Sequence, residues 1–356
     1  MTGLADRVSG GLAASLIGDA MGSATEMLTA GQICERFGYV TGFLAPGEDT
    51  FAVGRAAGQL TDDGLLTIAL LDELAANNGA ITADRTAALL LEWADDPEVF
   101  DRFAGPSSRK AILALRQGQR PELAGAPDPM ANDLRISNGA AMKVAPAGWT
   151  HPGEPGLAVD LACVICVPTH NTNIAFAGAG AVAAAVAAAS AGAARADVLE
   201  AALAGARSGD QVGLRRAVEV PGPSVEARIE LALRIVDQDA PPTDRLADLA
   251  SVIGSGLPIT EAVPMAIGLV ALFGDDPMEL IRRSVNLGGD TDTVAAIAGA
   301  ISGTMAGLGA LDAGLVAQVE EANGIDIGRT GEAVAAMVLS RGAPGGRRAA
   351  RGRAER

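Results

Sequence analysis

The chain is poor in three residue types that many folds and binding sites require. Of its 356 residues only 3% are aromatic, three are cysteine and two are histidine. Glycine contributes 45 residues, and alanine is also abundant. This balance favours closely packed helices with small contact residues over a β-sandwich, whose strands use more β-branched and aromatic residues. With 49% hydrophobic and 20% charged residues, the composition is that of a globular protein.

Positive charge is also scarce, with 27 Lys and Arg against 43 Asp and Glu and a net charge of −16. Such a balance argues against generic binding to nucleic acid or to an anionic membrane. The segment Arg341–Arg356 is the exception, because it holds six Arg and one Glu. We predict one domain over residues 1–340 and a disordered tail over 341–356, with a nucleic-acid-binding arm as the minor alternative.

The few cysteines and the N-terminal sequence bear on location. We see no signal peptide at the start, so a reduced, cytoplasmic setting is the expectation. Cys163 and Cys166 form a single C-x-x-C in an apolar run. Without a second pair, core packing is favoured over zinc binding. The uncharged run Ile174–Ala189 is mostly Ala and Gly, so it predicts a buried helix and no membrane span.

Apolar residues recur at helical spacing along most of the chain, and no strand alternation competes with them. The prediction is therefore an all-α single domain. The predicted helices that matter below are 4–21, Ala83–Trp93 with Thr82 as its N-cap, Asn173–Ser190, Ala196–Ala206 and Val294–Ala306, while Gly38–Gly58 and Gly118–Asp133 are predicted to be irregular.

Two acidic clusters stand at predicted helix starts. In the first, Asp290 and Asp292 alternate with Thr291 and Thr293, and the glycine pair before them suits a tight backbone turn. Hard oxygen ligands at this spacing suit Mg²⁺, Mn²⁺ or Ca²⁺, but Asp and Thr also serve as helix caps. Taken alone, the cluster leaves both interpretations open.

The second cluster is Thr61-Asp62-Asp63. A helix cap is again the simpler interpretation of this cluster alone. Adjacent carboxylates, however, raise each other's pKa unless a cation lies between them. Brought together, the two clusters supply enough oxygen ligands for two divalent ions, a site that can orient a diol or activate water.

Together with four further motifs, these clusters resemble the ADP-ribosylglycohydrolase family over nearly the whole chain. The motifs are Gly18-Asp19-Ala20-Met21-Gly22, Thr61-Asp62-Asp63, Ser137-Asn138-Gly139-Ala140-Ala141-Met142, Thr169-His170-Asn171, Gly254-Ser255-Gly256 and Gly288-Gly289-Asp290-Thr291-Asp292-Thr293. The resemblance implies a compact all-α fold with a binuclear Mg²⁺ or Mn²⁺ centre. The implied metal ligands are Thr61, Asp62, Asp63, Asp290, Asp292 and Thr293.

The activity implied by the resemblance is hydrolysis of the ribosyl C1″–N or C1″–O bond of an ADP-ribosyl group. Asp62, Asp63, Asp292 and Glu26 are the implied catalytic carboxylates, and Asp62 is expected to contact both metal and substrate. Glu26 stands where some members carry a gating glutamate that is associated with the metal. The alternative for Glu26 is an exposed loop acid.

The substrate-binding residues implied by the resemblance lie in four loops. Lys143 stands where relatives often have Arg, either to add a compensating charge or as an exposed side chain. A structural or capping role is the alternative for His170. The implied residues are Ser137, Asn138, Gly139, Ala140, Ala141 and Met142 around the diphosphate, His170 beside them, Gly256 and Leu257 near adenosine, and Ser107 in the Ala104–Ser108 loop.

Two departures from the family pattern limit the prediction of the substrate. Leu257 stands where relatives often have an aromatic residue, and Ala104 stands where nitrogenase-type members carry an acid. Arginine-linked ADP-ribose is therefore not assumed. An ADP-ribosylated protein is the leading substrate. The resemblance also implies a monomer. A small ADP-ribose ester, a ribonucleoside-type substrate, a non-catalytic structural relative and a metal phosphohydrolase are the alternatives.

Overall fold

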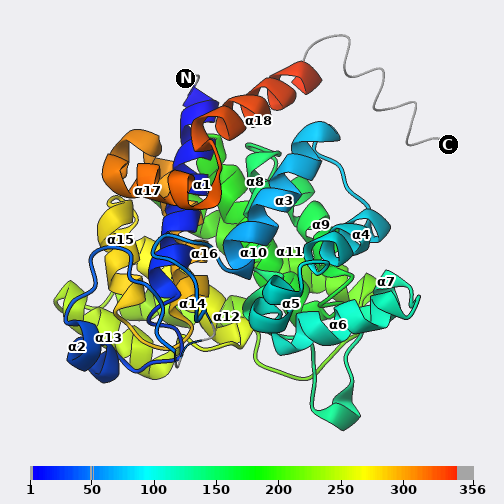
Figure 1. Cartoon of the computed structure of the whole chain (residues 1–356), viewed down its shortest axis with the longest axis horizontal. Coiled ribbons are helices and arrows are strands. Elements are labelled where there is room, and N and C mark those ends of the chain that lie inside the picture. Colours follow the sequence, from blue (N-terminus) through cyan, green and yellow to red (C-terminus); the bar gives the residue numbers. More distant parts are fainter. Residues whose placement is uncertain (1–2, 49, 51, 343–356) are drawn as a thin grey trace.

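The computed structural model describes residues 3–48, 50 and 52–342, and in this part the regular elements are helices (Figure 1). Strand pairing there is limited to isolated bridges, which confirms the all-α prediction. The elements are α1 (Gly3–Gly22), α2 (Ala30–Phe37), α3 (Asp62–Ala76), α4 (Ala83–Trp93), α5 (Pro97–Phe103), α6 (Pro106–Arg116), α7 (Pro121–Ala124), α8 (Ala145–Trp149), α9 (Pro155–Cys166), α10 (Asn173–Ser190), α11 (Arg195–Arg216), α12 (Val225–Val236), α13 (Pro242–Val252), α14 (Ile259–Phe273), α15 (Pro277–Val285), α16 (Thr291–Ala306), α17 (Ala313–Asn323) and α18 (Ile327–Gly342), with short 3₁₀ helices η1 (Pro129–Ala131), η2 (Asn138–Ala140) and η3 (Leu308–Ala310).

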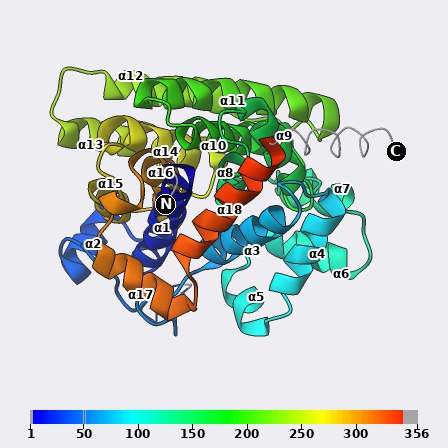
Figure 2. The ribbon, with the colours of Figure 1, turned by 90° about the horizontal axis from the view of Figure 1, so that it is seen from above.

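Helices α1, α10 and α16 form the centre of the molecule, and nearly all of their residues are buried. Helices α4 to α7 lie together on one side of α1, and α2 and α13 lie on the other (Figure 1). Seen from above, α11 and α12 run along one edge, away from α17 (Figure 2). The first and sixteenth helices, far apart in the sequence, are thus neighbours in the core.

Small residues let α1 and α16 approach closely. A Cβ added to Gly18 would lie 2.6 Å from the carbonyl carbon of Ala295, and one on Gly22 would lie 2.4 Å from the Cα of Asp292. Neither distance leaves room for a side chain, so these glycines are required for the crossing. The crossing brings the C-terminal end of α1 against the N-terminal end of α16, where the acidic cluster of Asp290 and Asp292 begins.

Several local predictions are confirmed. Helix α4 spans Ala83–Trp93, and the Thr82 hydroxyl accepts a hydrogen bond from the Arg85 N–H as its N-cap. Helix α10 is long and apolar enough to cross a membrane, but 94% of it is buried inside the protein. It is therefore a core helix, as predicted. Cys163 and Cys166 are buried free thiols in α9.

Other boundaries differ from the prediction. Helix α11 continues ten residues beyond Ala206, because Gly209 and Gly213 are contact residues that lie against α10 rather than helix ends. Helices α2 and α5 occur where no helix was predicted. Helix α18 extends to Gly342, so Arg341 of the predicted tail is helical, and its guanidinium donates to the Thr150 carbonyl. Residues 343–356 lie outside the described part of the chain.

Candidate metal centre

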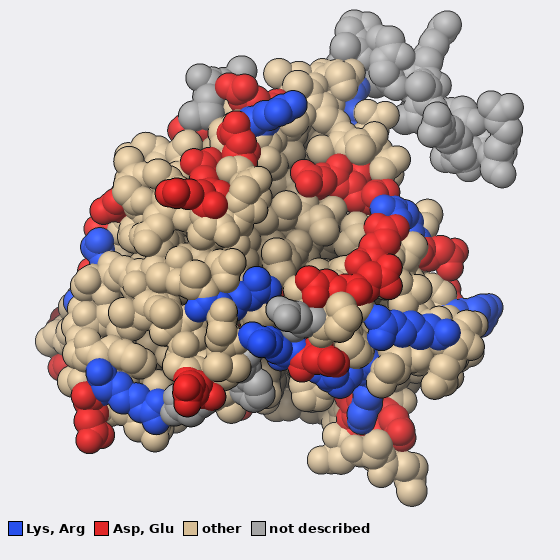
Figure 3. All heavy atoms as spheres, viewed as in Figure 1, with Lys and Arg blue, Asp and Glu red and all other residues tan. Residues whose placement is uncertain are grey.

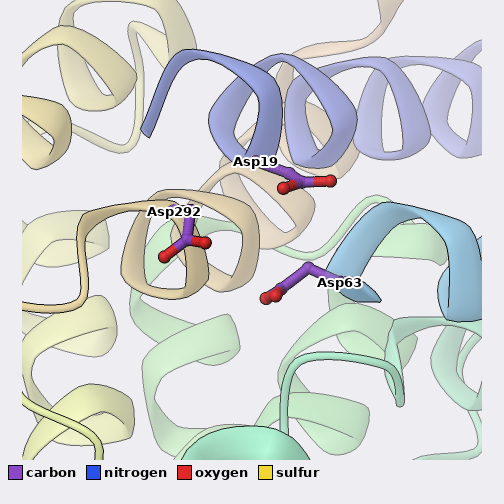
Figure 4. A group of neighbouring side chains, drawn as sticks. All are labelled: Asp19, Asp63 and Asp292. Carbon is purple, nitrogen blue, oxygen red and sulfur yellow. The ribbon is translucent and has the colours of Figure 1, made fainter. Parts of the chain in front are cut away.

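The two acidic clusters meet at one buried point between α1, α3 and α16. The carboxylates of Asp63 and Asp292 have oxygen atoms within 4.8 Å of each other, and the Asp19 carboxylate lies equally near (Figure 4). Asp290 and Asp292 form a second such group with Glu26. Thr293 contacts Asp63 through its side chain. Four of the six predicted ligand residues, Asp63, Asp290, Asp292 and Thr293, thus come together from two distant segments.

Asp19 is a member of this centre to which the sequence analysis assigned no role. Its two carboxylate oxygens accept hydrogen bonds from the Thr61 N–H, the Thr61 hydroxyl at 2.5 Å and the Gly64 N–H at 3.0 Å. The side chain is fully buried. Asp19 therefore holds the first turn of α3 against α1. Its sequence signal was a single acid in the apolar and small-residue stretch 8–22 of this helix.

The two acidic clusters do not act as simple helix caps. Thr61 is the N-cap of α3 and Asp290 is the N-cap of α16, but neither side chain accepts a capping hydrogen bond. The Thr61 hydroxyl donates to Asp19 instead. The Thr291 hydroxyl donates to the Gly22 carbonyl at 3.0 Å, which ties α16 to α1. Most of these oxygen-bearing side chains are therefore not needed as caps.

The glycine pair before Asp290 forms the predicted turn. Gly288 and Gly289 have φ values of 88° and 83°, a region that side chains disfavour. Gly289 exchanges backbone hydrogen bonds with Met27 and Leu28. These bonds fix the 23–29 loop beside α16, so that Glu26 comes within reach of Asp290.

Burial and mutual repulsion make the charged state of this centre costly. Burial, with neighbouring carboxylate charges, raises the pKa of Glu26 and of Asp62 to about 8. Burial likewise raises the pKa of Asp63 and of Asp292 well above the usual range. Burial also raises the pKa of Asp19 to about 6, against three hydrogen bonds that lower it. Protons or cations must neutralise such a group.

The residues fit a divalent metal. Oδ1 of Asp63 is buried and has no hydrogen-bond partner in the described part of the chain, a condition that costs free energy unless a ligand supplies the missing contact. The donor set consists of carboxylate and hydroxyl oxygens, which Mg²⁺ and Mn²⁺ prefer. Asp63, Asp290, Asp292, Thr61 and Thr293 are buried, whereas Asp62 and Glu26 are partly exposed. The last two therefore form the open side of the centre.

The predicted diphosphate loop lies beside this centre. Residues 138–140 form η2, and the loop is joined to the 254–257 segment by a bridge between Ser137 and Pro258. Lys143 is fully buried beneath the loop, where its ammonium group donates to the Gly139 carbonyl. It is therefore not an exposed side chain. Burial lowers the pKa of Lys143, whereas the nearby carboxylates of Asp62 and Asp63 act to raise it.

His170 lies behind the loop. Its Nε2 is 2.7 Å from the Ser137 hydroxyl and its Nδ1 is 2.8 Å from the Thr169 hydroxyl. The ring is fully buried, and burial lowers its pKa well below the usual value, so it is neutral. Since both ring nitrogens have partners, we expect His170 to act on a ligand through Ser137.

The remaining predicted substrate residues lie further out. Gly256 donates its N–H to Glu261, and Leu257 is 43% exposed while its carbonyl accepts from the Asn138 N–H. The Ser107 hydroxyl is 3.4 Å from the Asp133 carboxylate. Among the described residues, no hydrogen bond joins Ser107 to the carboxylates of the centre. Ser107 therefore stays a predicted contact for the outer part of a substrate.

Comparison with known proteins assigns this architecture. A computed family model described as ADP-ribosylglycohydrolase matches residues 1–344. The chain is 32% identical over 334 residues to the uncharacterized protein YegU of Escherichia coli K12, covering 93% of this chain and 96% of that one. It is 30% identical over 288 residues to an uncharacterized protein of Archaeoglobus fulgidus, covering 81% of this chain and 83% of that one.

A solved structure has the same fold. It is described as an ADP-ribosylglycohydrolase-related protein complex, and it superposes with a TM-score of 0.67 at 23% identity, over 95% of this chain and all of that one. The helical fold and the family match define the class as a hydrolase of the glycohydrolase type. The chain belongs to the ADP-ribosylglycohydrolase family.

Proposed function

We propose that this protein is a divalent-metal-dependent hydrolase that cleaves the C1″–N or C1″–O bond of an ADP-ribosyl group. Family membership supports a hydrolase whose substrate bears ADP-ribose. The observation that carries the metal requirement is the convergence of the buried carboxylates of Asp63 in α3 and Asp292 in α16, where Oδ1 of Asp63 has no hydrogen-bond partner among the described residues. An ADP-ribosylated protein is the leading substrate.

The chain offers ligands for two Mg²⁺ or Mn²⁺ ions. When bound, such ions orient hydroxyl groups and lower the pKa of a bound water. Asp19 takes part by fixing Thr61 and the first turn of α3, rather than by facing the open side. The residues that would hold the ions are Thr61, Asp62, Asp63, Asp290, Asp292 and Thr293.

The partly exposed carboxylates are suited to meet the substrate. Asp62 and Glu26 form the open side of the centre, so the ribose hydroxyls next to C1″ would approach them. Cleavage of a glycosidic bond passes through an oxocarbenium-like state with positive charge on the sugar. Fixed carboxylates stabilise that charge more than they stabilise the ground state, which is the condition for catalysis.

The acidic protein body must still accept a diphosphate. On the face shown in Figure 3, Lys and Arg lie in separate small groups that are mixed with Asp and Glu. We propose that the loop 137–142 supplies the compensating contacts through the Ser137 hydroxyl and backbone N–H groups. The buried charge of Lys143 lies directly beneath this loop, which also favours an anion there.

The decisive experiment is to incubate the protein and Mg²⁺ or Mn²⁺ with arginine-, serine- and acetyl-linked ADP-ribose and to identify the products by mass. Free ADP-ribose from one of these substrates is expected. Release of inorganic phosphate would instead indicate a phosphohydrolase, and cleavage of ribonucleosides alone would indicate a nucleoside N-glycosidase.

A binding experiment tests whether the ADP-ribose site depends on a divalent metal. ADP-ribose should raise the melting temperature only when Mg²⁺ or Mn²⁺ is present. Asp292→Ala should abolish this shift and lower kcat/KM by more than about 100-fold, because it removes a carboxylate shared by both groups of the centre. A shift of equal size in EDTA would contradict the proposal.

A further inference from the structure

Asn138 lies in the 137–142 loop, on the side of the loop that faces the candidate metal centre. Its side chain is 3% exposed. Its N–H donates to the Leu257 carbonyl at 2.8 Å, and its carbonyl accepts from the N–H groups of Ala141 and Met142 at 2.7 and 3.0 Å. The backbone on both sides is thus held, which leaves the direction of the side chain well defined.

The Asn138 side chain points to a predicted metal ligand. Its Nδ2 donates a hydrogen bond of 2.6 Å to Oδ2 of Asp290. Asp290 is itself 2% exposed, and its N–H donates to the Ser255 carbonyl at 2.7 Å. A short N–H···O hydrogen bond fixes the orientation of the carboxylate that accepts it. One of the two Asp290 oxygens is therefore already used.

We infer that Asn138 is a positioning residue that holds Asp290 for metal binding through Oδ1 alone. This inference rests on the proposed function, because it assumes that Asp290 binds a divalent ion. Groups that donate hydrogen bonds to ligating carboxylates set both their geometry and their affinity for metal. Asn138 acts on Asp290, whereas its neighbour Ser137 acts on a different partner, His170.

The adjacent residues supply a matched pair of variants. Asn138→Leu keeps approximately the size of the side chain but removes the amide donor, so Asp290 loses the hydrogen bond to its Oδ2. Ser137→Ala changes the next position of the same loop and removes the contact with His170, away from Asp290. A general disturbance of the loop affects both variants, whereas the loss of the Asp290 contact affects only the first.

The test measures Mg²⁺ and Mn²⁺ binding to the full chain by calorimetry, without substrate. We expect Asn138→Leu to weaken the metal by about 10- to 100-fold and to change the Mn²⁺ EPR spectrum at saturating metal, with Ser137→Ala like the wild type in both. Asn138→Ser, whose hydroxyl is too short to reach Asp290, should repeat the loss if the leucine variant does not fold.

The outcomes are distinguishable. A wild-type protein that binds neither ion would overturn the proposed metal centre itself. A wild type that binds metal, with an Asn138→Leu protein of unchanged affinity and EPR spectrum, would overturn the role of Asn138 and leave the proposed function intact. An equal loss in Ser137→Ala would also overturn it, because the effect would then belong to the whole loop.

Discussion

At the scale of single residues, Asp19 shows how a buried side chain without a reactive role can define a site. Its carboxylate accepts hydrogen bonds from the Thr61–Gly64 turn, which carries Asp62 and Asp63. An asparagine at this position would present an NH₂ group toward N–H donors and would leave some of them unpaired. Unpaired buried donors cost about 1–3 kcal/mol each, so the turn is expected to shift.

The corresponding prediction is that Asp19→Asn weakens Mg²⁺ binding by about 10- to 100-fold. Calorimetric titration of the metal-free protein provides the measurement. Asp72→Asn is the matched control, because Asp72 is an exposed acid further along the same helix α3. If both variants bind Mg²⁺ as the wild type does, Asp19 does not position α3.

At the scale of elements, the contact between α1 and α16 decides where the two acidic clusters stand. A methyl group on Gly22 would overlap the backbone of Asp292. We therefore predict that Gly22→Ala lowers the free energy of unfolding by about 1–3 kcal/mol and weakens metal binding as well. Urea unfolding and metal titration on the same preparation measure both effects.

The control for this helix contact is Gly31 in α2. A Cβ there would meet only the Thr29 hydroxyl, at 4.0 Å. Replacing a helical glycine by alanine at an open position is expected to raise stability by about 0.5–1 kcal/mol, with no effect on metal affinity. A loss of stability in Gly31→Ala as large as that in Gly22→Ala would show that the crossing is not the cause.

At the scale of the whole molecule, the carboxylate centre links stability to pH and metal. In the folded protein the pKa of Glu26 and of Asp62 is raised to about 8, against about 4 in an unfolded chain. The folded state therefore binds more protons between these values. The stability contributed by the protonated groups is complete below pH about 4 and is lost as the pH rises towards 8.

We therefore predict that the metal-free protein in EDTA melts at a lower temperature at pH about 8.5 than at pH about 6. Because metal binding displaces these protons, the stabilisation by saturating Mg²⁺ should grow over the same pH range. Thermal unfolding at both pH values, with and without Mg²⁺, measures this. A metal-free melting temperature that rises from pH 6 to 8.5 would contradict the prediction.

Much of this protein could be predicted from local sequence. The Thr82 cap of α4, the glycine turn at Gly288 and Gly289, and the start of α3 at Asp62 depend on a few neighbouring residues, which the chain displays directly. The family motifs likewise mark both acidic clusters. Local signals failed where a residue packs against a distant partner. Gly209 is typical of a helix end by sequence, but in α11 it lies inside the helix and packs against α10.

The sequence by itself therefore determined the helical class, the two carboxylate clusters and the family, because each is written in short stretches of residues. Only the tertiary structure decided that Asp19 supports α3, that Lys143 is buried beneath the 137–142 loop, and that the Asn138 amide donates to Asp290. The physical reason is that burial and hydrogen-bond partners depend on which helices cross. In this chain the decisive crossing joins its first helix to its sixteenth.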